Sequence, residues 1–451
     1  MILRRSLLWG LVSHFGLWSF IGSFSVLLVI CQEYLVYWPA IRGWQPPGSV
    51  ERVSAGAATT RRLQLLLVAD PQIQGELHEP PGWLGHIQRW DADRYLRKSF
   101  DSVFSVVQPD AVIFLGDLLD EGIEISDSEF RQQAHRFLNV YSSAAQCPTI
   151  FIPGDNDVGG ESEPVSARRD RLFRICFSNQ PAVEALTGRG WQNLLRLYEV
   201  NAFSGDSRLL YGSETRPTDG TALTLILSHA PLLRTFSSHV FEIVKKFQPS
   251  LILSAHDHKA AFYTYNGTSG YSVGGRLQRR SLELQQDPLD FSISRSSAYV
   301  QELVLPTCSY RMGVPYMALG ALSLVLSPKV STGQLLQVDA TLQLYWLPRR
   351  FYHLYAYGAL GVTILVVILY RGLRYWFCQI GRKPRLSYDK PSLLELLLPS
   401  SFDWLKSRSR DASSSPLLVS QQSRLVASAW GQALAGRVVM SGSRGKRRTM
   451  A

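Results

Sequence analysis

The sequence predicts an α/β protein, a layered β-sheet structure flanked by helices, with one membrane-spanning helix on each side of it. Short apolar runs alternate with stretches of helical spacing between residues 63 and 247, which is typical of layered α/β sheets. Polar segments that carry chemistry directly follow five of these apolar runs. Two uncharged apolar segments, near either end of the chain, flank this region.

The first flanking segment contains no charged residue over positions 15–31, and about 20 apolar residues suffice to span a bilayer as a helix. Aromatic residues, which favour the headgroup level, follow it at Tyr34, Tyr37 and Trp38. A cleaved signal peptide is the alternative, but its apolar core is only about 7–15 residues long. We therefore expect a cytoplasmic N-terminus and retained anchor over 1–40, followed by a linker over 41–61.

Between the flanking segments, seven apolar runs are predicted to be strands: 63–69, 111–115, 149–152, 223–227, 251–253, 260–265 and 298–304. Helical spacing predicts helices over 91–107, 128–144 and 240–247. The first five strands are expected to end at one edge of a sheet, and the last two to belong to a second, more antiparallel sheet. The apolar stretch 312–327 is predicted to be a core strand because it is too short to span a membrane, and the polar stretch 276–297 is predicted to be a loop.

The second flanking segment, 351–370, is a run of 20 uncharged residues. The chain carries a net charge of +11, and 371–451 holds 15 Lys and Arg against 4 Asp and Glu, which accounts for the whole excess. Because basic residues near membrane segments stay cytoplasmic, 371–451 is predicted to be a basic cytoplasmic tail, largely disordered, and 62–347 to face a lumen. A charge excess confined to the tail argues against nucleic acid as a partner and leaves the lipid bilayer as one.

Asn266 begins the tripeptide Asn-Gly-Thr, an N-glycosylation sequon within the predicted lumenal part. Cys147, Cys176 and Cys308 also lie in that part. One disulfide among the three is compatible with a lumenal compartment, and the sequence does not determine which pair would form it.

The polar segments that follow the first five strands could together hold two divalent metal ions. Such a pair lowers the pKa of a bridging water and clamps the attacking and leaving oxygens of a displacement. The segments offer carboxylates, imidazoles and one amide as ligands: Asp70, Gln72, Asp117, Asp155, His229, His256 and His258.

The order of these segments resembles the calcineurin-like metallophosphoesterase superfamily, whose pattern is D-x-H, G-D, G-N-H-D, H and G-H-x-H. The resemblance covers residues 63–258. The sequences Gly-Asp-Leu-Leu-Asp-Glu-Gly at 116–122 and His-Ala-Pro-Leu-Leu-Arg at 229–234, with the two flanking spans, are similar to the membrane-anchored branch that trims ethanolamine phosphate from GPI-anchor glycans.

The resemblance implies a layered β-sandwich and a dimanganese site. Asp70 and His258 would bind the first metal, His229 and His256 the second, and Asp117 would bridge both. Asp155 stands where the family has an Asn ligand, and Gln72 stands where the family has a His ligand. Ala255 replaces the usual Gly.

Two departures bear on the chemistry. Three carboxylates rather than two favour hard ions such as Mn²⁺ or Mg²⁺, and Mn²⁺ is the expected cofactor. Asn156 occupies the place of the catalytic His that assists the leaving group, and it cannot donate a proton as an imidazolium would. His86, on the loop after the first strand, is a candidate replacement acid. Arg234 is a candidate for binding substrate phosphate, with a surface ion pair as the alternative.

The expected function is a phosphoric diester hydrolase of the endoplasmic reticulum or Golgi membrane. It would remove ethanolamine phosphate from a mannose of GPI-anchored proteins or GPI glycolipid, by attack of a metal-bridging hydroxide. A catalytically degenerate protein that binds GPI glycans, or acts as a cargo receptor, is the alternative motivated by Gln72 and Asn156. A phosphomonoesterase that acts on soluble lumenal substrates is a third.

Overall fold

The structure is a computed structural model that describes residues 2–47, 61–178, 191, 194–212, 222–234, 238–266, 276–294, 299–326 and 337–380. The helices are α1 (Ile2–Glu33), α2 (Pro39–Arg42), α3 (Trp83–Val107), α4 (Asp127–Val140), α5 (Asp155–Val158), α6 (Ala167–Cys176), α8 (Ser238–Phe247) and α9 (Arg350–Ile380), with 3₁₀ turns η1 (Leu35–Tyr37), η2 (Ser142–Gln146) and η3 (Tyr310–Met312). Most of the predicted linker and nearly all of the basic tail lie outside the described residues, so these two expectations stay predictions.

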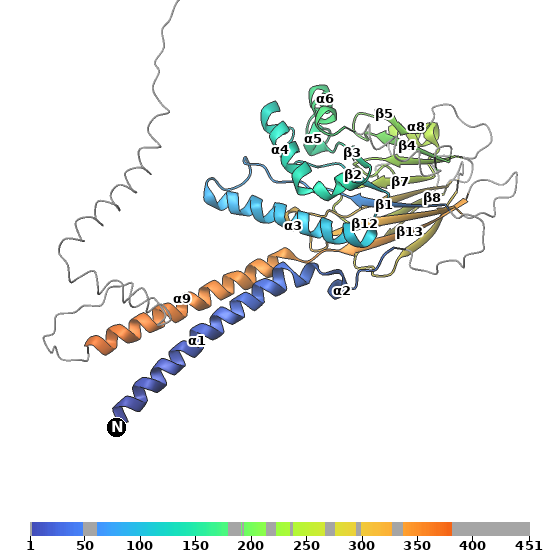
Figure 1. Ribbon diagram of the computed structural model, residues 1–451. Helices are drawn as coiled ribbons and strands as arrows, with labels where there is room; N and C mark the ends of the chain where they lie inside the picture. The colour runs from blue at the N-terminus through green and yellow to red at the C-terminus, as the bar shows by residue number, and fades with distance from the viewer. Residues whose placement is uncertain are drawn as a thin grey trace, which may run out of the picture. The chain divides into compact units, whose positions relative to one another are not determined.

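Two mixed sheets form the centre of the domain (Figure 1). The first has the order β10 (Leu289–Ser294), β13 (Gln337–Trp346), β12 (Ala318–Leu326), β1 (Arg61–Val68), β2 (Ala111–Leu115) and β3 (Thr149–Ile152). The second has the order β5 (Ser207–Tyr211), β4 (Leu195–Val200), β6 (Leu223–Leu227), β7 (Leu251–Ser254), β11 (Tyr299–Val304), β8 (Ala261–Asn266) and β9 (Arg276–Ser281). The parallel strands are β1–β2–β3 in the first sheet and β4–β6–β7–β11 in the second.

The two sheets pack face to face, and helices cover their outer faces. Alternation along β1 shows the arrangement: Leu63, Leu65 and Leu67 join the core between the sheets, whereas Leu66 and Val68 face α3 and α4 on the outside. The outer face of the second sheet packs against α8. All of these β1 side chains are buried, so a strand with both faces covered reads as a continuous apolar run, which is the pattern visible in the sequence.

All seven predicted strands are present, and the core strand expected within 312–327 is β12. The predicted loop over 276–297 was wrong, because it contains β9 and β10. β9 lies at the edge of its sheet, and all six of its side chains are exposed. Its backbone bonds with β8 hold it there, and an exposed polar edge strand has no apolar signal to reveal it.

The expected assignment of the first five strands to one sheet and the last two to a second, more antiparallel sheet was also wrong, because β6 and β7 lie in the same sheet as β8 and β11, and each sheet combines parallel and antiparallel pairing. The five strands that precede the polar segments are divided between the sheets: β1, β2 and β3 lie in the first, and β6 and β7 in the second. The polar segments therefore converge across the gap between two sheets, rather than along one edge of a single sheet.

Two helices are long and apolar enough to cross a membrane, over Gly16–Tyr37 and Arg350–Gln379. Residues Phe24–Leu365 form one compact unit that includes both sheets, the end of α1 and the start of α9. Met1–Ser23 and the chain from Val366 belong to a second unit. The orientation of the helices and the compartment stay predictions.

Candidate metal centre

Tight turns at strand ends aim the side chains of the centre. Among the described residues other than glycine, eight have a positive φ, and five of them are predicted ligands. These five are Asp70, Gln72, Asp117, His256 and His258, with φ between 38° and 66°. This left-handed region costs an ordinary residue free energy, and such strain concentrates at functional sites.

Glycines let the turns approach one another closely. Gly116 has a φ of 87°, and a Cβ at this position would lie 2.5 Å from Nδ1 of His229. A Cβ at Gly154 would lie 2.1 Å from Oδ1 of Asp117. Gly116 thus makes room for the imidazole of His229, and Gly154 makes room for the carboxylate of Asp117.

The first sheet supplies the carboxylates. Asp70 follows β1 and is fully buried, Asp117 follows β2, and Asp155 follows β3. Oδ2 of Asp70 has no hydrogen-bond partner among the described residues. Its Oδ1 accepts the backbone N–H of His256 at 3.3 Å, which links the first sheet to the second.

The second sheet supplies the imidazoles. Nδ1–H of His229 donates to the Leu115 carbonyl at 2.8 Å, so Nε2 is the nitrogen that faces the site, where it can exchange its proton for a metal ion. This Nε2 lies 3.0 Å from Oδ1 of Asp155 and 3.4 Å from Oδ1 of Asp117. Nδ1 of His256 lies 3.1 Å from the same Asp155 oxygen and 3.3 Å from Nε2 of His229.

Two groups of donor atoms are close enough to share metal ions, and they have His229 in common. One is Asp155, His229 and His256; the other is Asp70, Asp117 and His229. Two adjacent donor groups suit a two-metal centre, although the single free nitrogen of His229 would bind only one of the two ions. The buried carboxylates, the Asp70 oxygen without a partner and the inward Nε2 of His229 make a donor set that suits hard divalent ions.

The charged groups of the centre shift one another's pKa values. Burial raises the pKa of Asp70 to about 8, aided by the neighbouring Asp117 and opposed by His229 and His256. Asp155 is also partly buried, but hydrogen bonds with His229 and His256 hold its pKa well below the usual range. Burial works against the charged form of His229, yet Asp117 and Asp155 raise its pKa well above normal. Protons thus occupy the centre where cations can replace them.

His258 and the two amides adjoin this centre. Burial, followed by repulsion from His256 and His229, lowers the pKa of His258 against the attraction of Asp117. Nε2 of Gln72 donates to Oδ2 of Asp117 at 2.7 Å. Asn156 donates to both oxygens of Asp117, each at 3.0 Å, through its backbone N–H and its Nδ2. The ligand roles of Gln72 and His258 stay predictions.

Three further side chains hold the loops of the centre in place. Asp157 accepts the backbone N–H groups of Leu118, Leu119 and Gly154. Thr307 donates to the Asp70 carbonyl at 2.7 Å. Asp157 and Thr307 thus orient these loops, and sequence reasoning missed Thr307, which has no distinguishing sequence signal.

Glu302, on β11, was missed as well. It is fully buried and accepts the N–H groups of Leu232 and Leu233 together with the hydroxyl of Ser254. Burial raises its pKa to about 7. These contacts fix the loop that follows His229 and the end of β7 before His256. A charged Glu within a predicted strand, directly after Gln301, was the signal that could have identified it.

The remaining predicted site residues lie outside the donor groups. His86 is exposed in the first turn of α3, where Nδ1 contacts Arg89 at 3.0 Å. Arg234 pairs with Asp257 at 2.9 Å, so it lies beside the loop of His256 and His258. The roles of His86 as an acid and Arg234 as a phosphate ligand stay predictions.

A third group of possible ligands, His78, Asp120 and Glu121, lies on the loops after β1 and β2. Glu121 already accepts the backbone N–H groups of Glu76 and His78, so it serves to hold the loop.

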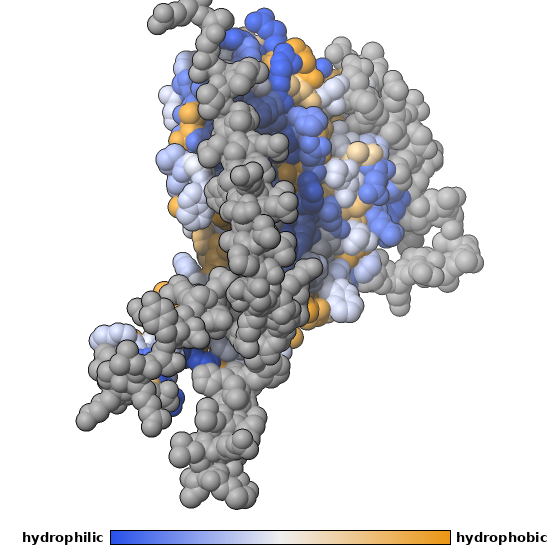
Figure 2. All heavy atoms as spheres, turned by 60° about the vertical axis from the view of Figure 1, so that its left-hand side comes forward, coloured by the Kyte–Doolittle hydropathy of each residue, from blue (hydrophilic) through white to orange (hydrophobic). Residues whose placement is uncertain are grey.

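Seen from the side that lies left in Figure 1, hydrophilic residues gather along the middle of the domain surface (Figure 2).

The expected modification sites are only partly described. Asn266 is exposed at the end of β8, and the residues after it in the sequon lie outside the described part. No disulfide joins any of the five cysteines, and Cys308 is buried beside the hydroxyl of Tyr141. The optional disulfide considered from the sequence is therefore not formed.

A family model described as "Calcineurin-like phosphoesterase" matches residues 63–260. This range contains every strand-end segment of the metal centre. Residues 63–260 therefore form a calcineurin-like metallophosphoesterase domain, which is a phosphoester hydrolase domain, and such domains use divalent metal ions.

Curated relatives are similar at low identity. "Metallophosphoesterase 1 homolog" of Drosophila melanogaster is 32% identical over 97 residues, which cover 22% of this chain and 25% of the relative. "Metallophosphoesterase 1" of Pongo abelii is 23% identical over 342 residues, covering 62% of this chain and 83% of the relative. "Cell division control protein 1" of Saccharomyces cerevisiae is 22% identical over 274 residues, covering 57% and 54%.

Proposed function

We propose that this calcineurin-like domain is a metal-dependent phosphodiesterase of the early secretory membrane that removes ethanolamine phosphate from a mannose of GPI-anchor glycans. One observation carries the hydrolytic part of the proposal. Carboxylates from one sheet and imidazoles from the other form two adjacent donor groups that share His229, with a buried Asp70 oxygen that has no described partner. Such a set needs protons or metal ions to balance its charge.

The donor groups and their neighbours define the roles of individual residues. Asp70, Asp117, Asp155, His229 and His256 would hold two divalent ions, with Gln72 and His258 as further ligands. Bound there, the ions would supply an activated water and stabilise the charge that develops on the phosphate oxygens. The hydrogen bond from His229 to Leu115 fixes the tautomer in which Nε2 can act as a ligand.

Asn156 holds Asp117 in place but cannot act as an acid. Its amide donates to the Asp117 carboxylate, and an amide has no acidic proton to give a leaving oxygen. A general acid typically contributes about 10²–10⁴-fold. The leaving alkoxide of a sugar therefore needs a proton from another group or from water. Arg234 lies beside the loop of His256 and His258 and would bind a phosphate oxygen of the substrate.

One observation supports a membrane-linked substrate. The chain carries two helices that could span a bilayer, and the end of the first and the start of the second belong to the same compact unit as the catalytic domain. The choice of a GPI glycan rests on the sequence resemblance to the membrane-anchored branch at 116–122 and 229–234.

The full-length protein, loaded with Mn²⁺, should hydrolyse a chromogenic phosphodiester and release ethanolamine phosphate from a GPI glycan. The control is Asp117→Ala, with metal content measured in both proteins. Absence of turnover above that control while two metals are bound would falsify the hydrolase. Turnover of the chromogenic diester without release of ethanolamine phosphate from the GPI glycan would reject the GPI glycan as substrate but not the hydrolase. A preference for phosphomonoesters would indicate that the protein is a phosphomonoesterase instead.

A glycan-binding protein without activity is the second candidate, and a specific observation favours it. The amides of Gln72 and Asn156 both donate to Oδ2 of Asp117, at positions where the family pattern has histidines. Asn156→His and Gln72→His distinguish the two candidates. Activity that appears only in the variants supports the binding protein, whereas an active wild type whose rate is merely altered supports the enzyme.

A further inference from the structure

One face of α3 has an exposed apolar half and a charged half. The charged half lies where the two candidate membrane helices meet the domain. Residues spaced by three or four along a helix share a face. Residues 83, 87, 90, 94, 98 and 101 follow this spacing within α3. The first three are apolar, and the last three are charged.

The apolar half of this face is exposed. Trp83, Ile87 and Trp90 are 76%, 51% and 60% exposed, and Leu84 beside them is also exposed. We call these four residues the α3 apolar patch. Two tryptophans and two aliphatic residues within two helical turns are unusual on a surface that faces only water, and aromatic side chains of this type favour the interface of a bilayer.

The charged half of the face contacts the ends of both candidate membrane helices. Arg94 and Lys98 pair with Glu33, the last residue of α1. Glu33 accepts a hydrogen bond from Nη1 of Arg350, the first residue of α9, at 2.6 Å. Arg350 also pairs with Asp91 of α3 at 2.5 Å. These five residues, which we call the membrane-exit cluster, fix α3 directly against the point where both helices leave the domain.

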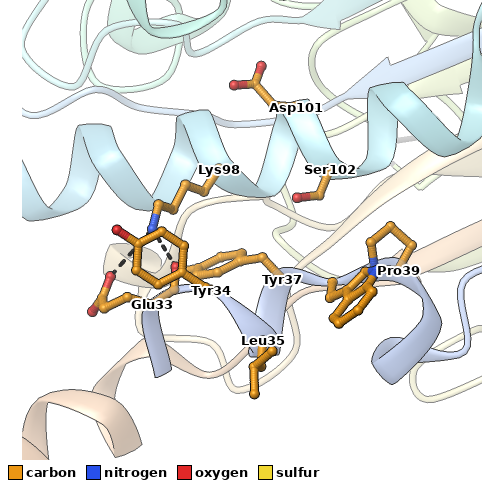
Figure 3. Close-up of a pocket in the computed structure, with 9 residues that line it drawn as sticks. Glu33, Tyr34, Leu35, Tyr37, Pro39, Lys98, Asp101 and Ser102 are labelled. Atoms are coloured by element: carbon orange, nitrogen blue, oxygen red, sulfur yellow. Dashed lines mark hydrogen bonds and ion pairs between the residues drawn. The ribbon is translucent and has the colours of Figure 1, made fainter. Parts of the chain in front are cut away.

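A cavity of about 400 Å³ opens on the same face between α3 and the chain that follows α1. Lys98, Asp101 and Ser102 of α3 line one side, and residues 33–35 and 37–39 line the other (Figure 3). The Lys98 ammonium lies 4.4 Å from the ring centroid of Tyr34. Aromatic walls with a cation beside them have the amphipathic character of the headgroup level, and Tyr34 and Trp38 are themselves exposed.

We propose that the α3 apolar patch lies in the interface of the same phospholipid bilayer that α1 and α9 span, so that three elements rather than two hold the domain against the membrane. Continuity argues for a bilayer over a second protein. The patch lies one turn from Arg94, and Arg94 is bonded to the end of α1. A partner protein on this patch would have to share the space with lipid around the two helices.

The apolar area and the neighbouring cations agree with this occupant. Interfacial helices bury an apolar face at the boundary of headgroups and acyl chains, and basic residues beside that face contact lipid phosphates. Arg94 also lies over the ring of Trp90, 5.4 Å from its centroid, which joins the apolar and basic halves. The proposal depends on α1 and α9 spanning a membrane, and it is independent of the hydrolytic activity.

The test places a photoreactive benzoylphenylalanine at single positions of the full-length protein in phosphatidylcholine nanodiscs. Ile87 is the test position, Val26 within the predicted span is the positive control, and Ile175 on α6 is the matched solvent control. The three side chains are 51%, 60% and 65% exposed, and α6 lies across the domain from the point where α9 begins (Figure 1). Lipid adducts are counted by mass spectrometry after irradiation.

We expect lipid adducts at Val26 and Ile87 and a several-fold lower yield at Ile175. Ile87 giving no more adduct than Ile175, while Val26 crosslinks, would overturn the proposal, as would crosslinking of Ile87 to a second copy of the chain. Lack of adduct at Val26 would overturn its premise that α1 spans the bilayer. In a Trp83→Ser, Trp90→Ser double variant the Ile87 adduct should fall several-fold while the Val26 adduct is unchanged; because both tryptophans are exposed, the domain should still fold.

Discussion

The metal centre and the membrane-exit cluster are both buried groups of charges, but they are neutralised in opposite ways. In the membrane-exit cluster, the guanidinium of Arg350 binds Glu33 and Asp91 together, and all three residues are at most 7% exposed. In the metal centre, Asp70 and Asp117 are buried at least as deeply, yet no Lys or Arg pairs with them among the described ion pairs.

The difference shows what each group is built to do. A buried carboxylate must be paired, protonated or bound to a metal, because an isolated charge is strongly disfavoured in the interior. The membrane-exit cluster contains its own counter-charge and is complete as folded. The metal centre has only imidazoles to balance its carboxylates. An imidazole is a cation only while it is protonated, and it can bind a metal ion once that proton is lost. The centre can therefore exchange protons for metal ions.

The largest expected effect is on catalysis, in the metal centre. Asp117→Asn removes a charge from the donor group that Asp117 forms with Asp70 and His229 and should lower turnover by about 10³-fold, the scale seen when a key electrostatic stabiliser is lost. Above about pH 8, where Asp70 is ionised, the metal-free variant should nevertheless unfold at a higher temperature than metal-free wild type, because repulsion between Asp70 and Asp117 is relieved. Turnover and thermal unfolding in EDTA measure the two effects, with the exposed Asp206→Asn as control.

Arg350→Met tests the opposite behaviour in the membrane-exit cluster. Removal of the guanidinium leaves Glu33 and Asp91 without their shared counter-charge, and breaking a buried pair in this way costs about 3–5 kcal/mol. The variant should lose stability in detergent or nanodiscs equally with and without Mn²⁺. A loss that Mn²⁺ restores would contradict the separation between the two groups. Arg349→Met, the adjacent basic residue, is the control.

The pH dependence should also separate the two states of the metal centre. The pKa of Asp70 is raised from 3.8 to about 8 by burial and by Asp117, and that of His229 is raised by Asp117 and Asp155 against burial. Between the unfolded and folded pKa values the native state holds protons that the unfolded chain has lost, so metal-free stability should fall as pH rises from about 5 to 8.

Metal ions replace these protons, so the difference in unfolding temperature between Mn²⁺-loaded and EDTA-treated protein should widen over the same pH range. Asp70→Asn should flatten the fall in the metal-free protein. A metal-free stability that rises with pH over this range would show that the buried acid is not protonated in the folded state.

A smaller effect is expected at Gln72. Its amide contacts Asp117 at 2.7 Å, and loss of a group that orients a ligand typically lowers metal affinity by about 10–100-fold. Gln72→Ala should therefore weaken Mn²⁺ binding measured by calorimetry, without a change in metal-free folding. If affinity is unchanged, Gln72 is neither a ligand nor an orienting group. Gln74→Ala, on the same loop, is the comparison variant.

The smallest effect on stability is expected at Arg234, whose half-exposed ion pair with Asp257 is worth about 0–1 kcal/mol. Arg234→Ala should leave the unfolding temperature nearly unchanged and raise KM for a phosphodiester. Lys259→Ala, next to the same loop, should change neither. An unaltered KM in Arg234→Ala would leave this residue as a surface ion pair only.

Much of the fold and of the site was predictable from the sequence, because buried strands form apolar runs and the polar ligands directly follow these runs. The seven predicted strands are present, since buried strands leave continuous apolar runs. The exposed edge strand β9 was not predictable, because backbone pairing with β8 holds it and its side chains contact solvent. Glu302 and Thr307 were missed because their function is to fix other loops, and their partners are distant in sequence.

The sequence by itself determined the ligand types, their order and the two flanking apolar segments, because each of these is a local property of the chain. Only the tertiary structure decided that carboxylates come from one sheet and imidazoles from the other, and that Glu33 and Arg350, 317 positions apart, share one buried cluster. Convergence of this kind depends on strand order and sheet packing, which long-range contacts establish and no single stretch of sequence encodes.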